Sequence, residues 1–326
     1  MAVLLAALFA ADRYLLDGLS PYVRLLIVTS AINALLAASL NLVNGVTGLF
    51  SIGHAGFMAC GAFLTAGTLA HFGRDGVLPV LWDMAGGLGA TLVYTGILAA
   101  GGLLAVVASL IVGVPTLRLR GDYLAIATLG FGEIIRVLIV NTEKLGGARG
   151  LSVPVRYLVD DRLFPVLSVT ILGIIFLYRL VHSNRGLSYF TVREDEVAAR
   201  SIGISTTRTR IEAFVIGSFF AGVAGAMMGF TQTLVHPDSF QFLRSIEIVV
   251  MVVLGGLGSF TGAVSAAVLL TLLLEGLRST PLQAPEWRLI IYALLLIVMM
   301  LFRPQGLLGR WEITSWWRSR RQGGAS

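Results

Sequence analysis

Few side chains in this 326-residue sequence have the types and spacings needed for covalent chemistry. The four histidines, His54, His71, His182 and His236, form no close-spaced ligand motif such as H-E-x-x-H. The sequence also lacks a G-x-S-x-G nucleophile turn and a G-x-x-x-x-G-K-[ST] phosphate-binding loop. Cys60 is the only cysteine, so neither an intrachain disulfide nor a cysteine-based metal site can form. We therefore expect no catalytic residue, no metal site and no cofactor in this chain.

One pair of opposite charges lies within an apolar stretch, residues 122–141. Glu133 and Arg136 are three residues apart, which places them on one face of a helix, where each partly neutralises the other. Ionisable side chains in a membrane span usually face a bundle interior or a cavity. A structural ion pair near the helix end is equally compatible with this pattern. Gly130 and Gly132, just before the pair, favour tight packing or local flexibility.

The stretch "NGVTGLFSIGHAGFMACGAF", residues 44–63, combines glycine and other small residues with one histidine. The residue types favour a close helix–helix contact, in which Gly53, Gly56 and Ala62 let neighbouring backbones approach. The alternative is a segment that lines a transport route, with His54 as a polar group facing it.

The charged residues are concentrated in "REDEVAARSIGISTTRTR", residues 193–210. Acidic residues followed by basic ones and then Gly203 predict a short helix over 193–203. Such a helix is too polar to enter lipid and would lie at the cytoplasmic face of a membrane. A plain solvated loop is the alternative, but a helix with no soluble domain beside it favours a docking surface for another protein.

The elements that must position these residues are predicted to be membrane helices. The chain is 56% hydrophobic and only 13% charged, with a mean hydropathy of +0.85 and 38 glycines, unlike a soluble domain. A span needs roughly 20 apolar residues. We predict an all-α polytopic bundle with broken helices, a single domain over 1–326 with about eight to ten membrane segments. The candidate spans are 23–43, 48–72, 86–114, 121–141, 164–182, 211–235, 245–277 and 288–302. The apolar N-terminus is interpreted as a short first helix or an interfacial segment, because no basic residue precedes Arg13.

The long block 245–277 is predicted to be a hairpin and not one span. "LGGLGSFTG", residues 254–262, supplies the bend, because Gly255, Gly256 and Gly258 offer little resistance to an irregular backbone. A broken helix in a membrane is tolerated only where its free backbone groups meet protein or water.

Arginine distribution predicts the orientation. Arginines collect at 118–120, in 193–210 and in the tail 303–326, where three tryptophans form an interfacial anchor. If these regions are cytoplasmic, residues 159–165 and 235–240 are outside, and both ends of the hairpin are outside as well. The net charge of +6 therefore reflects membrane orientation and does not indicate nucleic-acid binding.

Several segments together resemble the LivM-type permeases of branched-chain amino acid ABC importers. They are "LRLRGDYLAIATLGFGEIIR", "EVAARSIGI", "FFAGVAGAM", "VVLGGLGSFTGAV" and "LFRPQGLLG", and the resemblance extends from about Asn41 to Gly309. It implies a permease subunit of the bacterial inner membrane, with alternating access coupled to a separate ATPase. It also implies the partners: a LivH-like second permease, two subunits that bind ATP and Mg, a substrate-binding protein and membrane lipid.

"EVAARSIG" is similar to the EAA-type loop of ABC permeases, a coupling helix that contacts the ATPase subunit, although the strict EAA spacing is not matched. The resemblance thus implies these ATPase contacts: Arg193, Glu194, Asp195, Glu196, Ala199, Arg200 and Gly203.

Other functions remain open at this point. An ion-coupled secondary transporter or channel would need acids at the membrane midplane, where only Glu133 and Glu275 are obvious, and it gives residues 193–210 no role. A scaffold would not need the glycine-rich break, and related ABC permeases carry urea or amides. The candidates for the translocation path or gate are Gly53, His54, Gly56, Gly130, Gly132, Glu133, Arg136, Gly255, Gly256 and Gly258.

Overall fold

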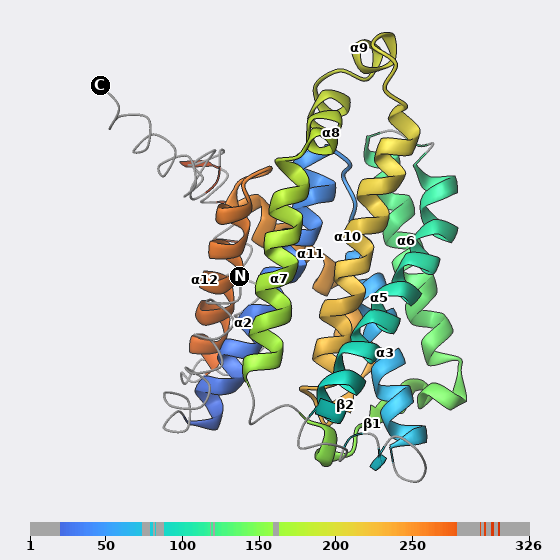
Figure 1. The fold of residues 1–326 in the computed structure, drawn as a ribbon, viewed down its shortest axis with the longest axis vertical. Helices are drawn as coiled ribbons and strands as arrows, with labels where there is room; N and C mark the ends of the chain where they lie inside the picture. The colour runs from blue at the N-terminus through green and yellow to red at the C-terminus, as the bar shows by residue number, and fades with distance from the viewer. Residues whose placement is uncertain are drawn as a thin grey trace.

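The computed structural model shows a bundle of α-helices joined mostly by short loops (Figure 1). It describes residues 20–73, 79–80, 82, 88–117, 119, 121–158, 163–278, 294, 297, 301–302 and 306. The predictions for the N-terminal segment, for Arg118 and Arg120, for most of the span 288–302 and for nearly all of the tail 303–326 lie outside these residues.

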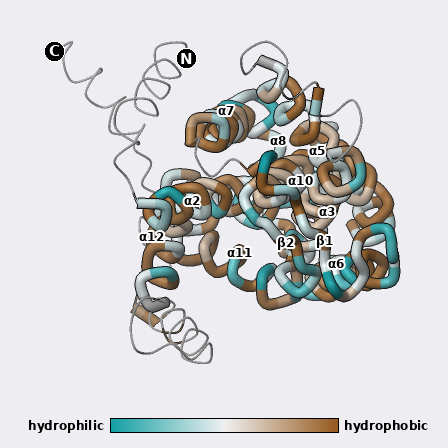
Figure 2. Tube along the Cα trace, turned by 90° about the horizontal axis from the view of Figure 1, so that it is seen from below, coloured by the Kyte–Doolittle hydropathy of each residue, from teal (hydrophilic) through white to brown (hydrophobic). Residues whose placement is uncertain are grey.

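Six helices in the described part of the chain are long and apolar enough to cross a membrane. They are α2 with its π-helical extension η1 (Pro21–Leu40 and Asn41–Val46), α3 (His54–Phe72), α5 (Leu88–Thr116), α6 (Asp122–Val140), α7 (Leu163–Val181) and α10 (Thr206–Gly229). Hydrophobic residues dominate these helices (Figure 2). The prediction of an all-α polytopic membrane protein is confirmed.

The two ends of the bundle carry different kinds of structure (Figure 1). Helices α8 (Asn184–Glu194) and α9 (Glu196–Ser201) project at one end, which we call the α9 end. Strands β1 (Leu151–Ser152) and β2 (Leu234–Val235) form a small antiparallel sheet at the opposite end, which we call the strand end. The short helices that flank these strands in the chain are η3 (Glu143–Leu145), η4 (Gly147–Arg149), η5 (Val155–Tyr157) and η6 (Pro237–Phe240).

The block 245–277 is interrupted where its glycines predicted a bend. Helix α11 spans Phe242–Gly255, and α12 spans Phe260–Arg278. Between them, Gly256 and Gly258 have φ values of +106° and +92°, a region that side-chain-bearing residues rarely adopt. The turn lies at the α9 end, because Gly258 is close to Arg193. Gly306 lies against Gly256, so the start of the C-terminal tail is at the α9 end too.

Two predicted spans have different limits in the structure. The predicted span 48–72 becomes helical only at His54, because residues 47–53 run in an irregular conformation after η1. The predicted span 211–235 begins earlier, at Thr206, and ends at Gly229, after which the chain turns towards β2. In both spans the apolar sequence extends beyond the helix. The backbone outside the helix forms hydrogen bonds with other segments.

Glycine permits the closest packing at the centre of the bundle, where α3, α5 and α10 meet. A Cβ atom added to Gly61 of α3 would lie 1.9 Å from the carbonyl oxygen of Gly222 in α10. One added to Gly222 would lie 2.6 Å from the carbonyl oxygen of Gly101 in α5. These neighbours are backbone atoms, which cannot rotate away as a side chain can. The three helices therefore depend on glycine at these positions.

We expect Gly61→Ala to destabilise the protein by about 1–3 kcal/mol or more, because the added methyl group overpacks a backbone contact. Gly96→Ala on α5 is the control, since no atom lies within 4 Å of its added Cβ. That change should be neutral or stabilising by up to about 1 kcal/mol, because alanine favours the helix. Thermal unfolding in detergent, followed by size-exclusion chromatography, measures both. Equal midpoints for the two variants would contradict the assigned packing.

Candidate functional site

The segment 47–53 has no regular helical structure and is partly buried, and side chains bond its backbone. The Asn44 side chain forms two bonds to Ser51, accepting from its N–H at 3.1 Å and donating to its carbonyl oxygen at 3.1 Å. The N–H of Ile52 donates to Oγ1 of Thr128 in α6 at 3.1 Å. Unpaired backbone groups are costly away from water. These bonds therefore hold the irregular backbone in place.

His54 begins α3 and is fully enclosed by protein. Its Nε2 lies 2.8 Å from Oγ of Ser39 in α2. Ser39 Oγ also donates to the carbonyl oxygen of Leu36 at 2.9 Å, an arrangement compatible with a proton on His54 Nε2. The next residue, Ala55, donates its N–H to Oγ of Ser245 in α11 at 3.1 Å. His54 thus joins two helices and does not face an open cavity in the described structure.

The glycines near His54 divide into packed and open positions. A Cβ atom on Gly53 would lie 2.3 Å from the carbonyl oxygen of Thr128, and one on Gly56 would lie 2.7 Å from Cα of Gly132. Gly53 and Gly56 therefore pack closely against α6 at the contact between α3 and α6. Gly130 has no neighbour within 4 Å of its added Cβ, so this contact does not require a glycine there.

The glycine-rich turn is anchored to the end of α2. The N–H of Gly258 donates to Oδ1 of Asn41 at 2.8 Å. A Cβ on Gly255 would lie 2.4 Å from the carbonyl carbon of Gly262, so the two arms of the hairpin cross at glycine. The turn and the segment 47–53 are two irregular pieces of backbone that share α2 as their support.

Glu133 and Arg136 form a network at the strand end. Arg136 Nε donates to Glu133 Oε2 at 2.7 Å, and its Nη1 lies 3.6 Å from Asp238 Oδ1. Glu133 Oε1 accepts from the N–H of Phe242, the first residue of α11, at 3.2 Å. An acid at a helix N-terminus satisfies a free N–H and the positive end of the helix dipole. The geometry favours a structural ion pair near the helix end over a pair that faces a cavity.

A second polar network, centred on Arg244, was not predicted. Arg244 of α11 donates to Oε2 of Glu247 at 2.8 Å and to Oδ1 of Asn33 in α2 at 2.7 Å. Asn33 in turn donates to Oγ1 of Thr271 in α12 at 2.9 Å. Glu247 is thus an additional acid in the membrane block. The sequence could have predicted this pair, because Glu247 is three residues from Arg244, the same spacing as in the pair on α6.

The predicted helix 193–203 is divided at Asp195. Helix α8 ends at Glu194, and Asp195 adopts an extended conformation before α9. Asp195 Oδ1 accepts from the N–H groups of Val197 and Ala198 at 2.7 and 3.0 Å. Aspartate is a favoured N-cap residue for this reason. Asp195 therefore serves as the cap that starts α9.

Gly203 ends α9 as its position predicted. It has a φ of +84°, and its N–H donates to the carbonyl oxygen of Arg200 at 3.0 Å. The N–H of Ile204 donates to the carbonyl oxygen of Ala199 at 3.0 Å, which completes a Schellman motif. Ala199 itself is fully buried, so its side chain faces the bundle and not an external partner.

The side chain of Glu196 is also directed inward. Its carboxylate accepts from Arg200 Nη2, from Arg210 Nη2 at 3.1 Å and from Thr206 Oγ1 at 3.3 Å. Only 18% of the Glu196 side chain is exposed. An acid with two arginine partners holds the loop between α9 and α10 in shape. It presents little free charge to an external protein.

The outer face of α9 is partly apolar. Val197 is 78% exposed and Ile202 is 69% exposed, although both are aliphatic. Arg193, at the end of α8, has its guanidinium bonded to the carbonyl oxygen of Gly45 within the bundle. Of the residues that the EAA-like pattern singled out, Ala199 is buried and Glu196 is mostly so. The others are exposed, as Val197 and Ile202 are: Arg193, Glu194, Asp195, Arg200 and Gly203.

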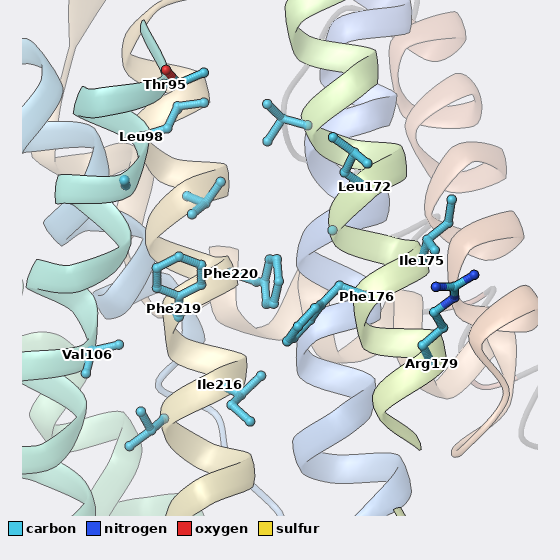
Figure 3. Close-up of a pocket in the computed structure, with 15 residues that line it drawn as sticks. Thr95, Leu98, Val106, Leu172, Ile175, Phe176, Arg179, Ile216, Phe219 and Phe220 are labelled. Carbon is cyan, nitrogen blue, oxygen red and sulfur yellow. The ribbon is translucent and has the colours of Figure 1, made fainter. Parts of the chain in front are cut away.

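An apolar groove of about 780 Å³ lies between α5 and α7, with α10 as its floor (Figure 3). The rings of Phe176 in α7 and Phe220 in α10 pack against each other in it, with centroids 5.6 Å apart. None of the predicted path residues lines this groove. In the part of the chain that the structure describes, no three His, Cys, Asp or Glu side chains come together in a group that could hold a metal ion.

We expect Glu133→Ala to destabilise the protein by about 1–2 kcal/mol, because it removes both the cap on α11 and the bond to Arg136. Glu133→Gln keeps an acceptor for Phe242 and should cost less. Glu143→Ala, an exposed acid at the same end, should leave the thermal midpoint unchanged. If the alanine variants of Glu133 and Glu143 unfold at the same temperature, the capping role is wrong.

Comparison with known proteins places the chain in a family. The family model described as "branched-chain amino acid transport system / permease component" matches residues 22–300. The chain is 36% identical over 306 residues to the high-affinity branched-chain amino acid transport permeases LivM of Salmonella typhimurium and Escherichia coli. These matches cover 84% of this chain and 67% of each relative.

More distant matches agree with this result. LivH of Escherichia coli, a permease protein of the same kind of system, is 33% identical over 132 residues, 40% of this chain and 42% of LivH. A probable LivM of Methanocaldococcus jannaschii is 24% identical over 308 residues, 84% of this chain and 89% of the relative. No solved structure matches significantly. The chain is a multi-pass membrane protein that belongs to the permease components of branched-chain amino acid transport systems.

Proposed function

We propose that this chain is the LivM-type subunit of an ATP-driven importer for branched-chain or related hydrophobic amino acids. It moves its substrate by alternating access, and the energy comes from ATP hydrolysis in separate subunits. The membrane is the bacterial inner membrane, and the α9 end and the tail 303–326 are cytoplasmic. The chain itself binds neither ATP nor Mg.

The observation that carries the proposal is the projecting α8–α9 segment. It extends beyond the bundle at one end, is capped at Asp195 and Gly203, and presents aliphatic Val197 and Ile202 outward (Figure 1). Exposed aliphatic side chains on a rigid helix suit insertion into an apolar pocket of another protein. An ion-driven transporter would have no use for this surface.

The partners follow from the same proposal. Matches to both LivM and LivH relatives support a pair of permeases, this chain and a LivH-like one. Two ATP-binding subunits dock at the α9 end, and a substrate-binding protein docks at the strand end. The binding protein selects the substrate, because the charges on the described bundle helices α6 and α11 are engaged with each other, as Glu133 is with Arg136 and Arg244 with Glu247.

The orientation can be tested by cysteine labelling in a Cys60→Ala background. Ser201→Cys marks the α9 end and Val155→Cys the strand end; both positions are exposed. An impermeant maleimide added to intact spheroplasts should label only the cysteine at 155, and lysis should expose both. Labelling of position 201 in intact spheroplasts would contradict the proposed orientation.

The docking surface can be tested with Val197→Asp and Ile202→Asp. Each places a charge where we expect an apolar pocket, and each should weaken ATPase binding by about 30-fold or more, as for an interface hot spot. Val155→Asp is the control for ATPase binding alone, because Val155 is 73% exposed at the opposite end, where the substrate-binding protein docks. Co-purification of the ATPase subunits and leucine uptake by reconstituted vesicles are the measurements. Normal binding and uptake in both α9 variants would refute this docking surface.

A further inference from the structure

The side chain of Arg193 joins the end of α8 to the irregular end of α2. Arg193 Nη1 donates to the carbonyl oxygen of Gly45, which lies in η1. Gly48 follows with a φ of +70°, and a Cβ atom there would lie 3.0 Å from Cγ of Arg193. The arginine stem therefore lies across Gly48 while its head holds the η1 backbone.

The turn between α11 and α12 meets the same point. A Cβ atom on Gly258 would lie 3.3 Å from Nη1 of Arg193, and one on Gly45 would lie 2.4 Å from the nitrogen of Gly258. The N–H of Gly258 is bonded to Asn41. We call Arg193, Asn41, Gly45 and Gly258 the Arg193 junction. It brings together one end of α8, the helix η1 from which the segment 47–53 continues, and the turn between α11 and α12.

Two properties suit the Arg193 junction to change its arrangement. Residues 41–46 form a π-helix, which carries wider hydrogen bonding than an α-helix and is often found at functional sites. Nδ2 of Asn41 is buried and has no hydrogen-bond partner among the described residues. A buried donor without a partner is unfavourable, so a displacement that brings an acceptor to this nitrogen regains part of that cost.

We propose that Arg193 is a positioning residue that transmits movement of α8–α9 to both irregular segments. A displacement of α8 pulls on the Gly45 carbonyl through the guanidinium and presses on the turn at Gly258. The inference rests on the proposed function, since it requires an ATPase that moves α9. It assigns Arg193 an internal role in place of a direct contact with the ATPase.

The test uses the complete complex in vesicles, with leucine uptake and ATP hydrolysis measured on the same preparation. Arg193→Ala should keep its ATPase subunits and hydrolyse ATP. The number of leucine molecules moved per ATP should fall by about 3- to 30-fold, the range for residues that couple two sites. Arg193→Lys, which retains a charged donor, should recover part of the loss. Arg208→Ala removes an exposed arginine nearby and should change nothing.

A distance measurement keeps the test decisive if Arg193→Ala folds poorly. Spin labels at Ser201→Cys and Leu257→Cys, in a Cys60→Ala background, report on α9 and the turn. Their distance distribution should be narrow in the parent and broader in the milder variant Arg193→Gln.

The outcomes separate the two proposals. An unchanged transport ratio with an unchanged distance distribution overturns the role of Arg193 alone. Loss of the ATPase from the Arg193→Ala complex also overturns it, because Arg193 would then be a docking residue. If the parent chain binds no ATPase at all, the proposed function itself fails.

Discussion

The structure depends on one constraint: backbone groups away from water must be hydrogen-bonded. The chain leaves regular helix at 47–53 and again at the turn after Gly255, and at both places side chains from other segments supply the bonds. Asn44 and Asn41, both in η1, and Thr128 in α6 are these suppliers. Because the bonds join different helices, the irregular segments cannot rearrange without a matching shift of α2 or α6.

Some residues at the α9 end fix the conformation of α9, and others are exposed on its surface. Asp195, Glu196 and Gly203 define how α9 starts, how its loop closes and where it stops. Aliphatic Val197 and Ile202 lie on the outer surface, which also carries exposed Glu194 and Arg200. Polar groups in water contribute little binding energy when they are already paired, whereas exposed aliphatic area gains on burial. One part of the charged composition of this stretch, the pairing of Glu196 with Arg210 and Arg200, therefore holds a small apolar surface in place.

Local features were predictable from the sequence, and features that depend on distant partners were not. The glycine-rich turn and the stop at Gly203 follow from backbone preferences of single residues. The start of α3 at His54 does not, because its irregular approach is stabilised by Thr128, 76 positions from Ile52, and by Ser245, 190 positions from Ala55. The inward direction of Glu196 likewise depends on Arg210 in the next helix.

The bond between Asn33 and Thr271 has a consequence for biogenesis. The two residues are 238 positions apart, and α2, which contains Asn33, has the largest share of buried residues among the six described spans. Ribosomes finish α2 long before α12 exists. During synthesis the Asn33 side chain therefore lies in the bilayer, or beside the insertion machinery, without its native partners until these have been synthesised. The first of the described helices to be made is therefore among the last to reach its final neighbours, so this part of the core closes only after α12 has been synthesised.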